Sequence, residues 1–531
     1  MVNLFLFALK IIFIALSCMI LAYISMAASV GPWISPAIIL LSNMFLLNFE
    51  LLKNKKHFFA LQNQAGASFA GLVATAIGFC LPTLYFLDAT AFKALLASPL
   101  VFCLDIGLLI IAGGLLGTVA MTTFGASTLT EASKIPTSEL FVQTHTQSIE
   151  RTEGTSISLG VGLSGLICLL RDGLFFGKKT LFNKLSFVNF YAKPTMWAVG
   201  YILGTGIIKP ILIGIVLQKI FITQIVANQK LLGLQLSSNN VAVLSTAFCC
   251  GVILFEIFFS LCKAGINKAK NLNFDYSIIP DKILNKFKNS WAIFFTTAFA
   301  ALVLKKFGFN FFACFFIVIG SIWASIEIAN FLLAYGMVPF GRFATFVMLP
   351  CLALFSLSPT QITILCIFVS ITCAATSNFF MQRGVSASTK LETQILDKEH
   401  WLGIFVASIL AGGIFWLLLS NLSLGSSELF AQRGQMRAIL ISTENFEKLF
   451  VFAGAFFGLI FQQLGLPISM ILGGLLMPLE LSFALVVGAC IRIFFAKTSK
   501  LEIFWTGIFA GEAIFVITAL LFKLLGNALN F

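Results

Sequence analysis

Four carboxylates lie inside otherwise apolar stretches of this sequence, and they are the side chains best suited to chemistry there. They are Asp105, Glu256, Glu327 and Glu512. Burial in an apolar medium disfavours the charged form of a carboxyl group, so such a group can take up and release a proton near neutral pH. We therefore predict that one of the four carries protons, with structural ion pairing as the alternative for each.

Glu512 and Glu327 are the leading candidates, and their surroundings differ. Glu512 follows Gly511, and a glycine at this position permits a second helix to approach closely. Asn330 lies three residues after Glu327 and shares its helix face, and Arg342 follows shortly after. A structural ion pair is therefore the alternative for Glu327.

The stretch 195–228 is too long for one ordinary membrane span, and glycine and proline interrupt it. The interrupting residues are Gly200, Gly204, Gly206 and Pro210. They free backbone polar groups, which a membrane tolerates only against protein or a wet cavity. In secondary transporters such breaks mark the substrate site. Elsewhere we interpret glycine pairs and doublets as helix packing, as in Gly454 with Gly458, Gly412 with Gly413 and Gly473 with Gly474.

Cysteine and histidine show no pattern of comparable strength. The 12 cysteines are scattered and lack the paired spacing of a zinc or redox site. The histidines at His57, His145 and His400 lie in polar segments, and we expect them to face water. The sequence therefore predicts no metal site and no cofactor. A membrane enzyme would need a clustered nucleophile, an acid pair or a metal set at a helix end, which the sequence does not show.

These residues must be positioned by membrane helices. Of the 531 residues, 59% are hydrophobic and 10% are charged, and the mean hydropathy is +1.00. Soluble domains carry about 25% charged residues, so an ordinary soluble fold is excluded. Stretches that reach the roughly 20 apolar residues of a spanning helix are clearest at 4–29, 66–87, 97–121, 241–262, 401–420 and 503–524.

The predicted fold is an all-α polytopic transmembrane bundle. The apolar runs lack the alternation of a membrane barrel. The chain has room for roughly 14–16 membrane segments of about 20 residues, and we expect 124–150 to be re-entrant or broken. We divide the chain into a transmembrane half at 1–264, a basic cytoplasmic loop at 265–288 and a second transmembrane half at 289–531.

The formal net charge of +13 is explained by the positive-inside rule, so we do not interpret it as a sign of nucleic-acid binding. Basic clusters fall in short loops between apolar runs, as the rule requires. Placing the clusters near 53–56, 171–184 and 263–288 in the cytoplasm also places the N-terminus there. Arg433 and Arg437 fall where simple counting puts the outside. The expected partners are the lipid bilayer, a small solute and protons, and the oligomeric state stays open.

Several stretches, in order along the chain, resemble conserved segments of the oligopeptide transporter family. They are QNQAGASFAGLVATAIGFCLPTLYFL at 62–87, LLRDGL around Arg171, AVGYILGTGI at 198–207, ILGGLLMPLELSFALVVGACIRI at 471–493 and GIFAGEAIF at 507–515. The resemblance implies a divergent bacterial-type member in the cytoplasmic (inner) membrane. It also implies proton-coupled uptake of oligopeptides or metal chelates, with Glu512 in the family's closing acidic motif.

Three further family segments are present in reduced form. They are IPTSELF around Pro136, VPFGRFAT with Arg342 added, and SNFFMQRGVSAST with Asn378 in place of the acid. Together with the interrupted stretch, these segments are expected to line a substrate path near the membrane midplane. The residues expected to bind the substrate there are Pro136, Ser138, Glu139, Gly200, Tyr201, Gly204, Asn330, Pro339, Gly341, Arg342, Thr345 and Asn378. A transporter of another solute class and a non-transporting membrane scaffold are the alternatives.

Overall fold

The protein is an all-α, multi-pass membrane bundle, as the sequence predicts. The computed structural model describes residues 2–27, 56–124, 151–172, 193–222, 290–335, 340–389, 392–426, 429–441, 448–466 and 479–495, and single positions within 224–255 and 471–519. Among these residues the only strand-like feature is an isolated bridge between Leu424 and Leu429. Six of the described helices are long and apolar enough to cross a membrane. The larger number of crossings stays a prediction.

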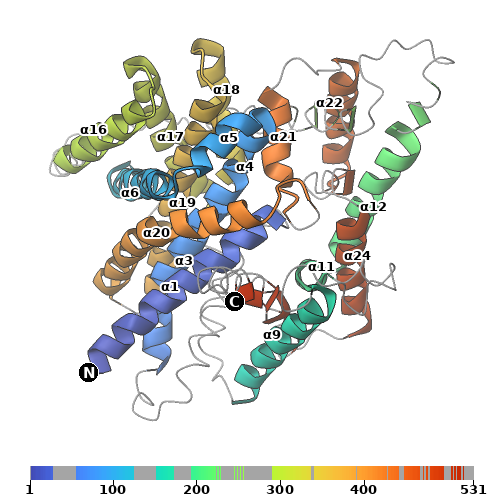
Figure 1. Ribbon diagram of the computed structural model, residues 1–531, viewed down its shortest axis with the longest axis horizontal. Helices are drawn as coiled ribbons and strands as arrows, with labels where there is room; N and C mark the ends of the chain where they lie inside the picture. Colours follow the sequence, from blue (N-terminus) through green and yellow to red (C-terminus); the bar gives the residue numbers. More distant parts are fainter. Residues whose placement is uncertain are drawn as a thin grey trace, which may run out of the picture.

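The larger group of helices is built around α19 (Pro359–Thr389), whose apolar window is wholly buried. It packs against α3 (Lys56–Cys80), α6 (Pro99–Phe124) and α20 (Thr393–Asn421), and α1 (Val2–Ala27) covers α3 and α20. Figure 1 shows these helices, in blue, gold and orange, crossing one another. Helices from both predicted halves of the chain therefore share one core.

Shorter and more peripheral helices complete this group. They are α4 (Pro82–Leu87), α5 (Ala89–Leu96), α16 (Ser290–Lys306), α17 (Phe311–Tyr335), α18 (Phe340–Leu354) and α21 (Gln432–Ile441). Phenylalanines on α16 and α17 point outward, with exposures of 61% at Phe294 and 75% at Phe311. Exposed aromatic side chains on apolar helices suit contact with lipid.

A second group of helices contributes residues to the main core and to a smaller core of its own. It contains α9 (Arg151–Asp172), α11 (Pro194–Leu203), η4 (Thr205–Ile207), α12 (Ile208–Val216), η5 (Leu217–Ile222), α22 (Lys448–Gln463) and α24 (Leu479–Phe494). α11 packs closely on α24, and Figure 1 shows α12, α22 and α24 on the right, apart from α16–α20. Buried residues of α11 and α24, such as Tyr201 and Leu485, belong to the main core. The smaller core contains Ile222, Leu244, Phe248, Val252, Phe450, Phe461, Ile471 and Leu475.

Pairs of glycines lie at several close helix crossings. A Cβ added to Gly403 would lie 2.7 Å from the carbonyl oxygen of Gly66, and one added to Gly66 would lie 2.8 Å from that of Glu399. Four further crossings repeat this arrangement, at Gly107 with Gly412, Gly200 with Gly488, Gly214 with Gly474, and Gly251 with Gly454. The interpretation of Gly412, Gly454 and Gly474 as packing residues is confirmed, but it is wrong for Gly413, where an added Cβ would meet nothing within 4 Å. Each crossing joins one predicted half to the other, and the division at 265–288 stays a prediction.

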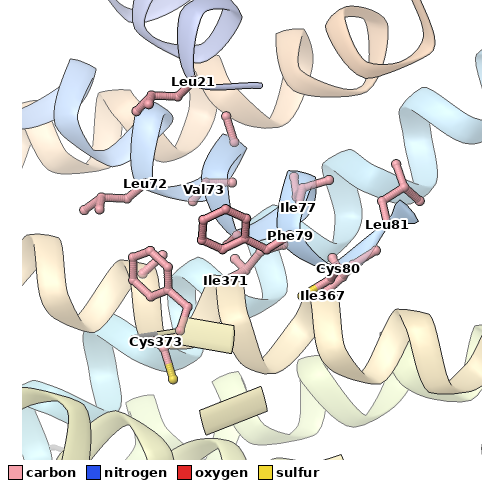
Figure 2. Packing of buried hydrophobic residues seen from close by; sticks show 14 of the residues in the cluster. Leu21, Leu72, Val73, Ile77, Phe79, Cys80, Leu81, Ile367, Ile371 and Cys373 are labelled. Carbon is pink, nitrogen blue, oxygen red and sulfur yellow. The ribbon is translucent and has the colours of Figure 1, made fainter. Parts of the chain in front are cut away.

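Apolar side chains fill the space between these crossings. Figure 2 shows Leu72, Val73 and Phe79 of α3 packed near Ile367 and Ile371 of α19, all of them 3% exposed or less. Lipid tails are as apolar as these side chains, so close van der Waals contact rather than exclusion of water holds such an interface together. This dense packing holds the buried polar side chains between α3, α19 and α20 in fixed positions.

Candidate functional site

A chain of polar side chains crosses the interface between α3, α19 and α20. Gln64 Nε2 donates a hydrogen bond to Gln382 Oε1 at 3.1 Å, and Gln382 Nε2 donates to Asn378 Oδ1 at 3.3 Å. Asn378 Nδ2 then donates to the carbonyl oxygen of Ala65 at 3.1 Å. Gln64, Gln382 and Asn378 are each 2% exposed or less. Asn378, predicted to line the substrate path, is therefore a fixed member of a buried network.

His400 continues this chain to α6. Its Nδ1 lies 2.8 Å from Asn378 Nδ2, and its Nε2 lies 2.9 Å from the Thr118 hydroxyl. The Asn378 amide presents N–H to both Ala65 and His400, so Nδ1 must accept. Thr118 donates its own proton to the Gly114 carbonyl oxygen at 2.8 Å, so Nε2 donates to Thr118. The network therefore fixes the neutral imidazole with its proton on Nε2.

The prediction that His400 faces water is wrong, because this side chain is 0% exposed. α20 begins at Thr393, so the charged residues before His400 belong to a helix that already packs on the core. Its acidic neighbours form ion pairs, Glu399 with Lys10 and Asp397 with Arg383. The charged residues before His400 can be read from the sequence, but the packing of other helices against this part of α20 cannot.

The predicted interruption of the 195–228 stretch is confirmed. α11 ends at Leu203, and Gly204 follows with a φ of 79° before η4 and α12 begin. Arg492 of α24 donates from Nη1 to the Tyr201 carbonyl oxygen at 3.0 Å. It thereby satisfies a carbonyl of the last turn of α11, where helices leave such groups without an internal partner. Pro210 lies in the first turn of α12.

Glu512 lies at the other end of α11. It is 2% exposed, and its Oε2 accepts a hydrogen bond from the backbone N–H of Thr195 at 2.9 Å. Thr195 is the second residue of α11, and the N-terminal end of a helix stabilises a negative charge. The hydroxyl of Thr195 and Nε1 of Trp197 are buried here without a hydrogen-bond partner among the described residues. A buried carboxylate and two unused polar atoms thus share the start of one half-helix.

The other predicted proton carriers have different surroundings. Asp105 on α6 forms an ion pair with Lys306 of α16, which is the structural alternative considered from the sequence. Glu327 is partly exposed on α17. Glu256 and the side chain of Asn330 lie outside the part of the chain that the structure describes. The described geometry therefore favours Glu512.

The start of α18 contains three of the predicted site residues, Gly341, Arg342 and Thr345. Thr345 is buried and donates to the Gly341 carbonyl oxygen within its own helix at 2.8 Å. Arg437 of α21 donates to the same oxygen at 3.3 Å and to the Phe79 carbonyl oxygen at 3.2 Å. In the sequence analysis, Arg437 was noted only because it falls where simple counting of membrane segments puts the outside. The sequence did contain a signal for a polar contact here, because arginines four residues apart, at 433 and 437, share one helix face.

The predicted site residues thus lie in three helix interfaces. The residues around Gly204 lie between α11 and α24, Asn378 lies among α3, α6, α19 and α20, and the start of α18 lies beside α21 and α3. Pro136, Ser138, Glu139 and Pro339 lie outside the described residues. Their convergence on one substrate path stays a prediction.

Comparison with other proteins does not supply a family. No protein-family model and no curated protein matches the chain. The resemblance to oligopeptide transporters rests on the sequence segments quoted above, and the function is inferred below from the geometry of this chain.

Proposed function

We propose that this protein is a secondary active transporter that couples the uptake of a small solute to protons. The observation that carries the proposal is the interrupted helix α11–η4–α12, with the buried Glu512 at its N-terminal end. A scaffold gains nothing from a broken membrane helix, whereas transporters use half-helix ends to bind solutes and ions. The break and the carboxylate belong to the same element, so protonation can act directly on it.

The coupling step follows from the hydrogen bond to Thr195. A charged Glu512 is stabilised by the Thr195 N–H and by the positive end of α11. Protonation removes the negative charge and so removes most of that stabilisation, while burial favours the neutral form. Proton uptake therefore weakens the attachment of α11 to the segment that carries Glu512. A half-helix that is held or released in this way can open the site to alternate sides of the membrane.

The solute is proposed from the sequence resemblance. Oligopeptides or metal chelates are the expected class, carried into the cell across a bacterial cytoplasmic membrane with the N-terminus inside. Another solute class is the alternative, since the family segments around Pro136 and Pro339 are reduced in this chain. The buried polar atoms of Thr195 and Trp197 provide hydrogen-bonding positions for either kind of solute.

Uptake by the purified full-length protein in proteoliposomes tests the proposal. The vesicles receive a panel of labelled di- and tripeptides and labelled metal chelates, with and without an inward proton gradient. We expect accumulation of at least one class above the external concentration, and its loss when a protonophore collapses the gradient. Protein-free vesicles provide the baseline. Uptake that only equilibrates, or no uptake and no exchange across the panel, would count against the proposal.

A further inference from the structure

α11 is attached at both ends to neighbouring segments, and the two attachments differ in kind. At its N-terminal end, the Thr195 N–H donates a hydrogen bond to Glu512 Oε2 at 2.9 Å. At its C-terminal end, Nη1 of Arg492 donates to the Tyr201 carbonyl oxygen at 3.0 Å. A carboxyl group thus lies at the start of α11 and a positive group near its end, which is the arrangement that the helix dipole favours.

Aromatic packing adds to the attachment at the C-terminal end. The rings of Tyr201 and Trp505 stack, with their centroids 4.9 Å apart and an angle of 20° between their planes. The guanidinium carbon of Arg492 lies 5.9 Å from the centroid of the same tyrosine ring. Ring contacts of both kinds are stabilising. Tyr201 is therefore held through its ring as well as through its carbonyl oxygen.

From Trp197 onward, α11 also packs closely on α24. A Cβ added to Gly200 would lie 2.0 Å from the Leu485 carbonyl oxygen, and one added to Gly488 would lie 2.0 Å from the carbonyl oxygen of Trp197. Glycines allow the two backbones to approach this closely. This crossing and the Arg492 contact both come from α24, so the later part of α11 is fixed to one partner helix.

The attachment at the N-terminal end is the one that a proton can switch. A carboxylate loses its charge on protonation, whereas guanidinium groups stay protonated in proteins, and backbone packing and ring stacking need no proton. α11 and its caps contain one charged residue, Lys193, which lies at the start of the helix and attracts a charged Glu512 as the helix end does. α9 packs on α11 and beside Gly511 and has no charged residue between 155 and 170, and Arg492 of α24 lies at the opposite end.

We infer that Arg492 is a positioning residue, which holds the C-terminal end of α11 as a fixed pivot while protonation of Glu512 releases the N-terminal end. The inference rests on the proposed function, and it adds where the half-helix turns. Gly204, with a φ of 79°, ends α11 and separates it from α12. The displacement is therefore smallest near Tyr201 and largest near Thr195, and access to the solute changes at the start of α11.

Hydrogen–deuterium exchange of the full-length protein in detergent micelles tests the pivot without any solute. Glu512→Gln mimics the protonated carboxyl group. It should speed exchange of the amides at 194–197 about threefold, in line with the loss of a charge at a helix end, and leave the amides at 200–204 at the wild-type rate. Faster exchange at both ends alike, faster exchange at 200–204 alone, or no change at either end overturns the pivot.

Substitution of Arg492 should give the opposite pattern. Arg492→Gln is expected to speed exchange at 200–204, and Arg492→Lys should restore most of the protection because it keeps a positive donor for the Tyr201 carbonyl oxygen. Arg383→Gln with Asp397→Asn removes another arginine and its ion-pair partner, and this control should change neither end of α11. Unchanged exchange at 200–204 in Arg492→Gln, or no recovery with lysine, would contradict the assigned role.

The wild type itself covers variants that fail to fold. Its exchange is compared at acid and neutral pH, with each rate corrected for the intrinsic effect of pH on amide exchange. Acid should remove protection at 194–197 and leave 200–204 protected. Equal loss at both ends, or no loss at 194–197, would overturn the pivot without the use of any variant.

Transport kinetics distinguish positioning from solute binding. In proteoliposomes, Arg492→Gln should lower the maximal rate of both accumulation and counterflow about tenfold, as expected for the loss of a charge-assisted hydrogen bond. The solute KM should stay unchanged, because the pivot acts through α11, and Arg492→Lys should recover most of the rate. A raised KM with a wild-type maximal rate would make Arg492 a solute-binding residue and overturn the inference.

The pivot and the transporter proposal fail separately. If Glu512→Gln speeds exchange only at 194–197 and the wild type takes up no solute, the pivot stands as a property of the fold and the transporter proposal ends. If the wild type accumulates solute with a proton gradient and Glu512→Gln speeds exchange at both ends alike, the transporter proposal stands and the pivot ends.

Discussion

The Nε2 atom of His400 lies 2.9 Å from the hydroxyl of Thr118 and thereby joins α20 to α6 inside the buried core. His400 also bonds to Asn378 of α19, so a single imidazole connects three helices. Phe69 and Phe379 pack edge-on against it, with ring centroids 5.1 Å and 5.7 Å away. Because the ring is fully buried, each lost hydrogen bond leaves a buried polar atom unsatisfied.

We predict that Thr118→Val lowers the free energy of unfolding by about 1–3 kcal/mol, the usual effect of leaving a buried donor without its acceptor. Thermal unfolding in detergent micelles measures the change. Thr122→Val on the same helix is the control, because among the described residues the Thr122 hydroxyl bonds only to the carbonyl oxygen of Val119 in its own helix. Equal losses in the two variants would show that the contact with His400 adds nothing.

The crossing of α3 and α20 gives a second prediction. Gly403→Ala places a Cβ 2.7 Å from the Gly66 carbonyl oxygen, and backbone atoms on both sides leave little room to shift. Overpacking of this kind costs about 1–3 kcal/mol. Gly413→Ala on the same helix has nothing within 4 Å of the added Cβ, and it should be neutral or stabilising by up to about 1 kcal/mol. If both variants unfold at the wild-type temperature, the crossing is looser than described.

Features encoded locally could be predicted from the sequence, and features that depend on helix partners could not. Apolar runs fixed the helical class and the positions of α1, α6 and α20, since a spanning helix needs a continuous apolar stretch. Gly204 and its neighbours predicted the break after α11, because glycine tolerates the positive φ that ends a helix there. These signals act within a few residues of one another.

The burial of His400 shows the other case. The three residues before it, Asp397, Lys398 and Glu399, are charged, and the local hydropathy therefore predicted exposure to water. Its partners Thr118 and Asn378 are separated from it by 282 and 22 residues, so no local pattern could reveal them. The hydrogen bond from Arg437 to the Gly341 carbonyl oxygen likewise depends on how α21 packs against α18.

The third prediction concerns Gly204. Alanine at a φ of 79° is strained by about 1–2 kcal/mol, and its Cβ would lie 2.8 Å from Nη1 of Arg492. We expect Gly204→Ala to reduce solute uptake in proteoliposomes more than it reduces the amount of folded protein. Gly206→Ala has open space around the added Cβ and should retain uptake. If Gly204→Ala takes up solute as the wild type does, the helix break at Gly204 has no role in transport.

The fourth prediction concerns pH and the loop between α4 and α5. Asp88 lies beyond the span that ends at Leu87, and it accepts hydrogen bonds from the side chain and backbone of Thr90 and the backbone of Ala91. The Thr90 hydroxyl, followed by the Ala91 N–H, holds the pKa of Asp88 below its ordinary value of 3.8. A lowered pKa means that this cap stabilises α5 above pH 3.8 and is lost as the pH falls through the folded-state value.

Hydrogen–deuterium exchange of the peptide that covers α5 tests this cap. Asp88→Ala should speed the exchange of the first amides of α5 at neutral pH, because the Thr90 and Ala91 N–H groups lose their acceptor. Asp88→Asn should preserve much of the protection, since asparagine caps helices well. Identical exchange in the wild type and in Asp88→Ala would show that the cap has no role in holding α5.

The fifth prediction separates proton coupling from solute binding at Glu512. Glu512→Gln keeps an oxygen that can accept the Thr195 N–H, so the variant should fold and insert. It loses the exchangeable proton, and we expect gradient-driven accumulation in proteoliposomes to fall to the level of protein-free vesicles. Counterflow exchange of labelled for unlabelled solute needs no net proton movement and should survive. Glu327→Gln, at a partly exposed position on α17, is the control and should retain accumulation.

If both variants accumulate solute with the pH dependence of the wild type, coupling lies elsewhere, and Asp105 and Glu256 become the next positions to test. Of these two, Asp105 already has Lys306 as a counter-ion, so proton uptake there would first have to break an ion pair.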